Sequence, residues 1–523
     1  MDADTIYRRR WWTLAVLCLS VLIILIDNTI LNVALPTLVR DLGATTSQLQ
    51  WIVDSYILVF AGLLLTAGSL SDRFGRKRIL SIGLLLFGIA SVLSSLATTP
   101  EQLIAARGLM GIGGSAIFPP TLSILTNVFP PAERGKAIAI WAGMSGLGVA
   151  LGPILGGFLL ENFYWGSVFL VNIPIVALAL VGGRLFIPES RDPRETRLDP
   201  AGAVLSISGL SVLLFAIISA PERGWTDPLI LAGFAAAAAL IAVFLWYEAR
   251  IDHPMLDVRL FANRRFSAAN GAVTLVFFAL LGSLFFVTQY MQYVLGFSPL
   301  QAGVRVLPVA VSIVIAANLS RVLVERLGTK VVVATGLSLV AIALGVVSNV
   351  TLETGYGLIS IFQVLLGIGL GLTIAPSTES VMGAVPRDRA GVGSAVNDTT
   401  RQVGGALGVA VLGSLLASGY RAGMASAVSG LPRDAAEAAS DSVGAAAAVA
   451  ARLPDAAQGQ ALLDAARASF VDALDSTVLF GMAAALLGAL VVALFLPSRP
   501  APAPAPAARA GRGEPLDLRA PTG

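Results

Sequence analysis

GSLSDRFGRKR, residues 68–78, is a short charged segment between two long apolar segments. Gly75 permits the tight backbone reversal that a turn between two antiparallel helices requires. The pattern Leu-x-acid-Arg-apolar-Gly-x-Lys of residues 70–77 returns in LVERLGTK, residues 323–330, 253 positions later. Two copies of one helical hairpin predict a duplicated bundle of membrane helices, an organisation that is common in transporters.

The composition excludes an ordinary soluble domain and several kinds of chemistry. Of the 523 residues 56% are hydrophobic and only 13% are charged, and the mean hydropathy is +0.81. A single cysteine, Cys18, and a single histidine, His253, leave no intrachain disulfide, no His/Cys metal site and no Cys–His dyad. A net charge of +3 is too small to favour nucleic acid binding. We therefore expect a lipid bilayer as partner, no metal, no cofactor and no enzymatic activity.

Apolar runs of about 20 residues, the length that a membrane-spanning helix needs, recur along the whole chain. They predict an all-α polytopic protein with fourteen spans, near residues 12–36, 49–70, 79–98, 102–127, 136–160, 165–187, 200–220, 228–247, 266–293, 299–322, 331–350, 356–381, 391–417 and 477–497.

The distribution of basic residues predicts the orientation of these spans. Arg8, Arg9 and Arg10 precede the first apolar run, which is too long for a cleavable signal peptide and indicates a signal anchor with a cytoplasmic N-terminus. Later basic residues concentrate in every second loop, as the positive-inside rule requires. These residues are Arg73, Arg76, Lys77, Arg78, Arg134, Lys136, Arg191, Arg194, Arg197, Arg250, Arg259, Arg264, Arg265, Arg321, Arg326, Lys330, Arg387 and Arg389.

The spans predict two six-helix bundles, residues 1–187 and 266–497, joined by a linker, residues 188–265, with two inserted helices. Residues 418–475 form a long outer loop, rich in alanine and with two stretches of helical periodicity, which we expect to be a small helical cap. The repeated Ala-Pro of residues 498–523 is typical of a disordered tail, here cytoplasmic.

Three ionisable residues lie within spans at a similar predicted depth: Asp27, Asp54 and Arg107. Buried charges in a membrane cost several kcal/mol unless they are paired or hydrated, so they predict a shared polar cavity. Because a low-dielectric cavity favours a neutral carboxyl group, Asp27 is a candidate proton carrier, cation-binding carboxylate, or both in turn. The alternative is a fixed ion pair with Arg107 that holds helices together.

The second half has its own intramembrane charges. Asp398 and Arg401 are three residues apart on one predicted helix, so we expect them to form an ion pair with a structural or gating role. Glu379 lies near the inner end of its span, where a solvated role is equally compatible with the sequence. No partner for Arg305 is evident.

The chain resembles the major facilitator superfamily, and specifically its fourteen-helix drug:proton antiporters. Residues 68–78 are similar to the signature between helices 2 and 3, which implies that Asp72 and Arg76 form a cytoplasmic gate. Residues 103–114 resemble the helix 4 signature, whose arginine, here Arg107, is linked to proton coupling. Residues 27–36 resemble the helix 1 signature of this family. Residues 165–174 resemble the start of its helix 6, and residues 404–413 resemble its run of glycines in helix 13.

The helix 5 signature, which is characteristic of exporters in this family, resembles GVALGPILGG, residues 148–157. Its members here are Gly148, Gly152, Pro153, Gly156 and Gly157. Small residues four apart allow close helix contact, and a proline bends a helix.

The resemblance implies export of hydrophobic, cationic drugs or toxic compounds from a bacterial cell, across the plasma membrane and driven by proton entry. Polar and aromatic residues of a central substrate cavity would include Trp51, Tyr56, Gln289, Tyr290, Gln292, Asn318 and Gln363. Two alternatives stay open: export of an endogenous lipid or secondary metabolite, and proton-coupled import of a small metabolite.

Overall fold

The computed structural model describes residues 3–42, 46–190, 199–252, 254, 256–386 and 390–498. Within these residues the chain forms helices and no strand. Fourteen segments are long and apolar enough to cross a membrane, which confirms the predicted all-α polytopic fold. The predicted tail beyond residue 498, His253 and residues 191–198 lie outside the described residues.

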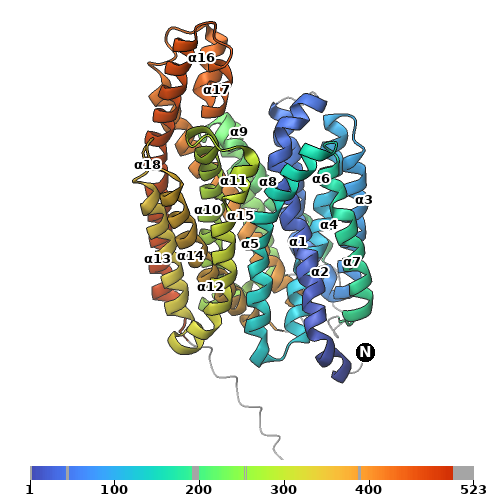
Figure 1. Ribbon diagram of the computed structural model, residues 1–523. Coiled ribbons are helices and arrows are strands. Elements are labelled where there is room, and N and C mark those ends of the chain that lie inside the picture. The colour runs from blue at the N-terminus through green and yellow to red at the C-terminus, as the bar shows by residue number, and fades with distance from the viewer. Residues whose placement is uncertain are drawn as a thin grey trace, which may run out of the picture.

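The first half of the chain occupies one side of the molecule (Figure 1). Its sixth span consists of two helices, α6 and α7, which are separated by a single residue, Val171. The helices of this half are α1 (Ala3–Leu42), α2 (Thr46–Phe74), α3 (Arg76–Ser95), α4 (Pro100–Val128), α5 (Pro131–Asn162), α6 (Ser167–Leu170) and α7 (Asn172–Phe186).

The second half lies beside the first (Figure 1). It begins after a short 3-10 helix, η1 (Val258–Ala262), and one of its spans is again divided, into α11 and α12. Its elements are α10 (Arg264–Gln289), the π-helix η2 (Tyr290–Val294), α11 (Pro299–Val304), α12 (Leu307–Leu327), α13 (Thr329–Val347), α14 (Tyr356–Ala384), α15 (Ala390–Met424), α16 (Arg433–Asp441), α17 (Val443–Ala450) and α18 (Ala456–Phe495).

Two helices between the halves, α8 (Pro200–Arg223) and α9 (Pro228–Glu248), pack against each other. Each starts with an aspartate that caps free backbone N–H groups and is followed by proline, a strong helix-start signal: Asp199 for α8 and Asp227 for α9. Helix α8 also packs against α2 of the first half and α15 of the second. The inserted pair therefore lies beside the junction of the halves.

The two copies of the turn motif adopt similar backbone conformations. Gly75 joins α2 to α3 with φ 108°, and Gly328 joins α12 to α13 with φ 84°. A side chain is strained in this left-handed region, so both copies need glycine. We call the end of the molecule with the Gly75 turn the basic end, and the opposite end, which carries α16 and α17, the capped end (Figure 1).

The predicted outer loop, residues 418–475, is mostly helix. Helix α15 continues to Met424 and α18 begins at Ala456, so both spans extend beyond their predicted ends and only residues 425–455 connect them. Helices α16 and α17 lie within this connection. The hydroxyl of Tyr420 on α15 donates to the carbonyl of Ala439 on α16, which attaches α16 to the bundle.

Candidate functional site

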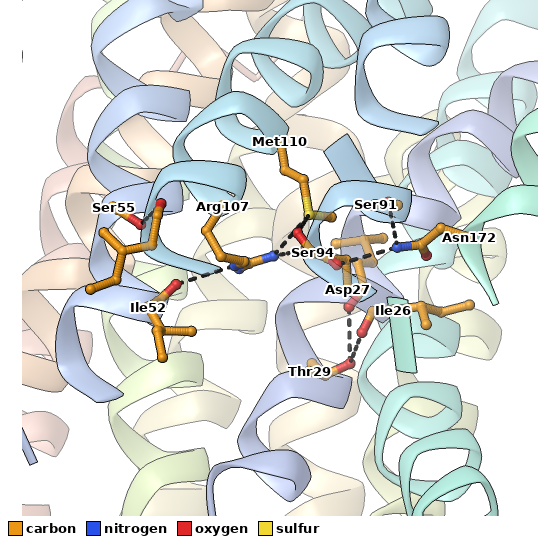
Figure 2. Close-up of polar contacts among 12 residues, drawn as sticks. Ile26, Asp27, Thr29, Ile52, Ser55, Ser91, Ser94, Arg107, Met110 and Asn172 are labelled. Carbon is orange, nitrogen blue, oxygen red and sulfur yellow. Dashed lines mark hydrogen bonds and ion pairs between the residues drawn. The ribbon is translucent and has the colours of Figure 1, made fainter. Parts of the chain in front are cut away.

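The central feature of the first half is a buried ion pair between α1 and α4. Asp27 is 0% exposed and Arg107 is 1% exposed. Arg107 Nη1 lies 2.5 Å from Asp27 Oδ2 (Figure 2). A buried carboxylate is stable when such a partner compensates its lost hydration, and removing one member of a buried pair costs about 3–5 kcal/mol. The structure thus brings together two of the three predicted intramembrane charges.

Helix α2 holds the other side of the arginine. Arg107 Nε donates to the carbonyl oxygen of Ile52 over 3.2 Å (Figure 2). The guanidinium group also lies 4.4 Å from the ring centroid of Tyr56, a cation–π distance. These two partners are neutral groups on α2, so neither contact involves the charge of Asp27.

Asn172, at the start of α7, supports the carboxylate from the opposite side. Its Nδ2 donates to Asp27 Oδ1 at 3.3 Å and to Ser91 Oγ of α3 at 3.2 Å (Figure 2). Two residues after Asp27, Thr29 donates to the carbonyl of Gly148 on α5. The site therefore involves six helices of the first half, α1 to α5 and α7, and of these α5 borders the second half.

Asp54 does not join this arrangement. It lies on α2 and is half-buried, but none of the described contacts of Asp27 or Arg107 involves it. Arg107 reaches α2 through the carbonyl of Ile52 instead. Their similar depth predicts that two acids and one base share a site. In the described contacts one acid, Asp27, pairs with one base, Arg107.

The two halves are joined at the basic end by Asp72. Its Oδ2 accepts hydrogen bonds from the backbone N–H groups of Gly391 (2.8 Å) and Val392 (3.2 Å), in the first turn of α15. Its Oδ1 forms an ion pair with Arg76 at 2.7 Å. A carboxylate at a helix N-terminus satisfies free N–H groups and interacts favourably with the helix dipole. The bonds from Gly391 and Val392 to Asp72 join the two halves, so they can only exist while α2 and α15 are in contact at this end.

Close helix contact accompanies this bond. A Cβ atom added to Gly68 would lie 2.6 Å from the carbonyl oxygen of Gly391 and 2.7 Å from Ala395 Cβ. Real Cβ atoms do not approach that closely, so glycine at residue 68 is required by the contact between α2 and α15.

The helix 5 motif also packs through its small residues. Gly148 and Gly152 face α1, where added Cβ atoms would collide with Leu25 and Thr29. Pro153 contacts Gly303 of α11, and Gly157 faces Leu300 of the same helix, while Gly156 is buried. Helix α5 therefore contacts the Asp27 helix on one side and the second half on the other.

The expected ion pair between Asp398 and Arg401 does not form. Both residues are buried, but Arg401 Nη2 donates to Thr378 Oγ1 of α14 at 2.9 Å. Its guanidinium group lies over the rings of Trp141 (4.9 Å) on α5 and Phe277 (5.3 Å) on α10. The prediction was wrong because residues three apart on a helix can pair but need not, and here neighbouring helices offer the arginine other partners.

The predicted cavity residues are dispersed. Tyr56 belongs to the Arg107 site, whereas Trp51 is 43% exposed and stacks on Phe215 of α8. The hydroxyl of Tyr290 donates to the carbonyls of Thr351 and Thr354, which attaches it to the loop between α13 and α14. The others share no described contact: Gln363 is buried, Asn318 is exposed, and Gln289 and Gln292 are half-buried.

Two partners of the site were not predicted from the sequence. Asn172 was noted only as part of a motif, and Ser91 not at all, although a polar residue within an apolar span is a signal for such a role. The carbonyl of Ile52 carries no sequence signal, because every residue has one.

A family model described as Major Facilitator Superfamily matches residues 17–409. The chain is 40% identical over 490 residues to the multidrug efflux pump LfrA of Mycolicibacterium smegmatis, covering 92% of this chain and 96% of the relative. It is 36% identical to the methyl viologen resistance protein SmvA of Salmonella typhimurium, covering 88% and 93%. The crystal structure of the human organic anion transporter MFSD10 has the same fold, with a TM-score of 0.61 at 16% identity, covering 92% and 99%.

The family match covers the residues of the basic-end turn and those around Arg107, and the match to LfrA covers 92% of the chain. With fourteen apolar helices and bacterial efflux relatives, the chain is a multi-pass protein of the plasma membrane. It belongs to the major facilitator superfamily.

Proposed function

We propose that the protein exports hydrophobic, cationic compounds from the cell in exchange for protons that enter it. The relatives support drug export, since LfrA is a multidrug efflux pump and SmvA a methyl viologen resistance protein. The observation that carries the coupling mechanism is the fully buried Asp27–Arg107 ion pair.

A proton and a cationic substrate compete for the same carboxylate. Protonation of Asp27 removes the charge that holds Arg107, so the contact between α1 and α4 weakens while Arg107 stays bound to Ile52 and Tyr56 on α2. A cation near Asp27 instead favours the ionised carboxylate and expels the proton. Because both states cannot exist together, each passage of substrate is linked to a proton passing the other way.

The basic end is the cytoplasmic gate in this proposal, and both chain termini are cytoplasmic. Basic side chains concentrate at that end, as expected for a cytoplasmic face. Asp72 and Arg76 close it through the first turn of α15. Residues 1–187 and 266–497 then move as two bundles, with α8 and α9 as an inserted pair. No cofactor takes part, and the proton gradient supplies the energy.

Ethidium uptake into everted membrane vesicles tests this function. An imposed gradient, acidic inside, should drive uptake by the wild type and by Asp41→Asn, whose carboxylate is exposed on the same helix. Asp27→Asn should abolish gradient-driven uptake. Uptake that is unchanged in Asp27→Asn would remove Asp27 from the mechanism, and ethidium leaving the vesicles with protons would favour import in the cell.

If the wild type ignores ethidium but Asp27-dependent proton movement follows addition of a lipid or a secondary metabolite, then the cargo is endogenous. This outcome would retain the coupling mechanism and reject the proposed drugs.

A further inference from the structure

Asp398 is a buried carboxyl group that forms no ion pair with the described residues. It is 1% exposed, on α15 in the second half. In the described part of the chain no basic nitrogen lies within 4.0 Å of it, although Arg401 is one turn away. Its hydrogen-bond donors are neutral and distant: Ser394 Oγ at 3.3 Å and Asn397 Nδ2 at 3.4 Å.

Asp27 and Asp398, which are both buried within a bundle, differ in this respect. Asp27 has an arginine nitrogen at 2.5 Å, whereas Asp398 has two long bonds from neutral donors. An ionised carboxylate that is buried without a counterion costs several kcal/mol, while a neutral carboxyl group does not. The geometry around Asp398 therefore suits the protonated form.

A protonated carboxyl group needs an acceptor for its O–H, and Asn397 supplies one. Its Oδ1 is buried and has no partner among the described residues. The two ends of the amide have the same shape, so exchanging them would place Oδ1 at 3.4 Å from Asp398 Oδ1. In that arrangement an acceptor oxygen, and not a second donor, faces the proton of Asp398.

Arg401 is the basic residue that lies one turn from Asp398 on α15. The helices that pack on α15 carry other charges, which make no described contact with the carboxyl group. These include Asp54 and Asp72 of α2, Arg107 of α4, Arg265 of α10, Glu379 of α14, and Asp472 and Asp475 of α18. The charge state of Asp398 therefore acts mainly on Arg401.

Arg401 links this carboxyl group to the opposite half. Its guanidinium group bonds Thr378 and lies over Trp141 of α5, and the indole N–H of Trp141 donates to Thr121 of α4. An ionised Asp398 would attract the guanidinium group away from these partners. A proton on Asp398 thus favours the contact between the halves that is present here.

Building on the proposed function, we infer that Asp398 is a second proton-binding carboxyl group of this transporter, and that it is protonated in the present conformation. Its deprotonation, with the proton passing to water, draws Arg401 from Trp141 towards Asp398. Transport then couples to one proton more than Asp27 alone carries.

Infrared spectroscopy of the purified protein tests the protonated state directly. A protonated carboxyl group has a C=O stretching band that an ionised one lacks. Asp398→Asn should lose one such band, whereas Asp41→Asn should retain every band. An Asp398→Asn protein that folds and has an unchanged spectrum in this region overturns the inference. If Asp398→Asn does not fold, Asp398→Glu replaces it and should shift the C=O stretching band. An unshifted band in Asp398→Glu would also overturn the inference.

A stoichiometry measurement supplies the second test. With ethidium as the probe in proteoliposomes, each coupled proton multiplies the accumulation ratio about tenfold per pH unit of gradient. Asp398→Asn should lower the limiting ratio about tenfold at a gradient of one unit, and an unchanged ratio would contradict a second coupled proton. Absence of ethidium transport in the wild type would reject the proposed drug cargo, while the infrared result would still decide whether Asp398 is protonated.

Discussion

The substitution Gly68→Ala tests the closed basic end most specifically. The added Cβ would lie 2.6 Å from the carbonyl oxygen of Gly391 and 2.7 Å from Ala395 Cβ, which both belong to the other half. The gain in helix propensity is the same in the open and closed states, so it cancels, but the collision exists only in the closed state. Overpacking of this kind costs about 1–3 kcal/mol, which corresponds to a shift of about 5- to 150-fold towards the open state.

The assay is the labelling rate of a cysteine that closure buries. Val392→Cys in a Cys18→Ser background gives one thiol in the first turn of α15, beside Asp72. A membrane-impermeant maleimide applied at the basic end reacts only with the open state. Gly68→Ala should therefore raise the labelling rate about 5- to 150-fold, up to the rate of a fully open protein. Gly271→Ala is the matched control, because no atom lies within 4 Å of its added Cβ. Equal rates in Gly68→Ala and Gly271→Ala would refute the reasoning.

Three further substitutions test separate parts of the structure. Gly75→Ala should lower the thermal stability, because a residue with a side chain at a φ of 108° costs about 1–2 kcal/mol. A thermal stability equal to that of Gly271→Ala would contradict this. Tyr290→Phe removes the O–H that is shared between the carbonyls of Thr351 and Thr354 and should cost about 1–2 kcal/mol of stability without changing ethidium affinity. A changed affinity would support the predicted cavity role of Tyr290. Asp72→Asn keeps the shape but loses the charge that binds Arg76 and the α15 N-terminus, so it should speed maleimide labelling of Val392→Cys, and an unchanged rate would exclude Asp72 as a gate residue.

The sequence predicted the number of apolar spans well because that information is local. Apolar length determines the number of spans, and Gly75 and Gly328 mark their turns through a backbone requirement that only glycine meets. The ends of the last spans were less predictable. Alanine-rich residues 418–475 favour helix inside and outside a bilayer alike, so their composition did not show that α15 and α18 extend beyond it.

The sites were predictable only in part, because partners depend on packing. Asp27 and Arg107 were predicted as site residues because they are charged residues within spans, and they form an ion pair. The same reasoning also selected Asp54, whose position on α2 does not bring it to Arg107. For Arg401 the sequence indicated the nearest acid, Asp398, as the partner, but in the fold Arg401 contacts Thr378 and the ring of Trp141 instead. Helix packing therefore determines whether a side chain pairs with a local or a distant partner.

The central claim is that Asp27 exchanges a proton for a cationic substrate. Ethidium added to the purified protein in weakly buffered solution should release protons, which a pH indicator dye measures. Asp27→Asn should release at least one proton fewer per ethidium bound, and Asp41→Asn should match the wild type. Equal release by Asp27→Asn and the wild type would contradict the exchange at Asp27.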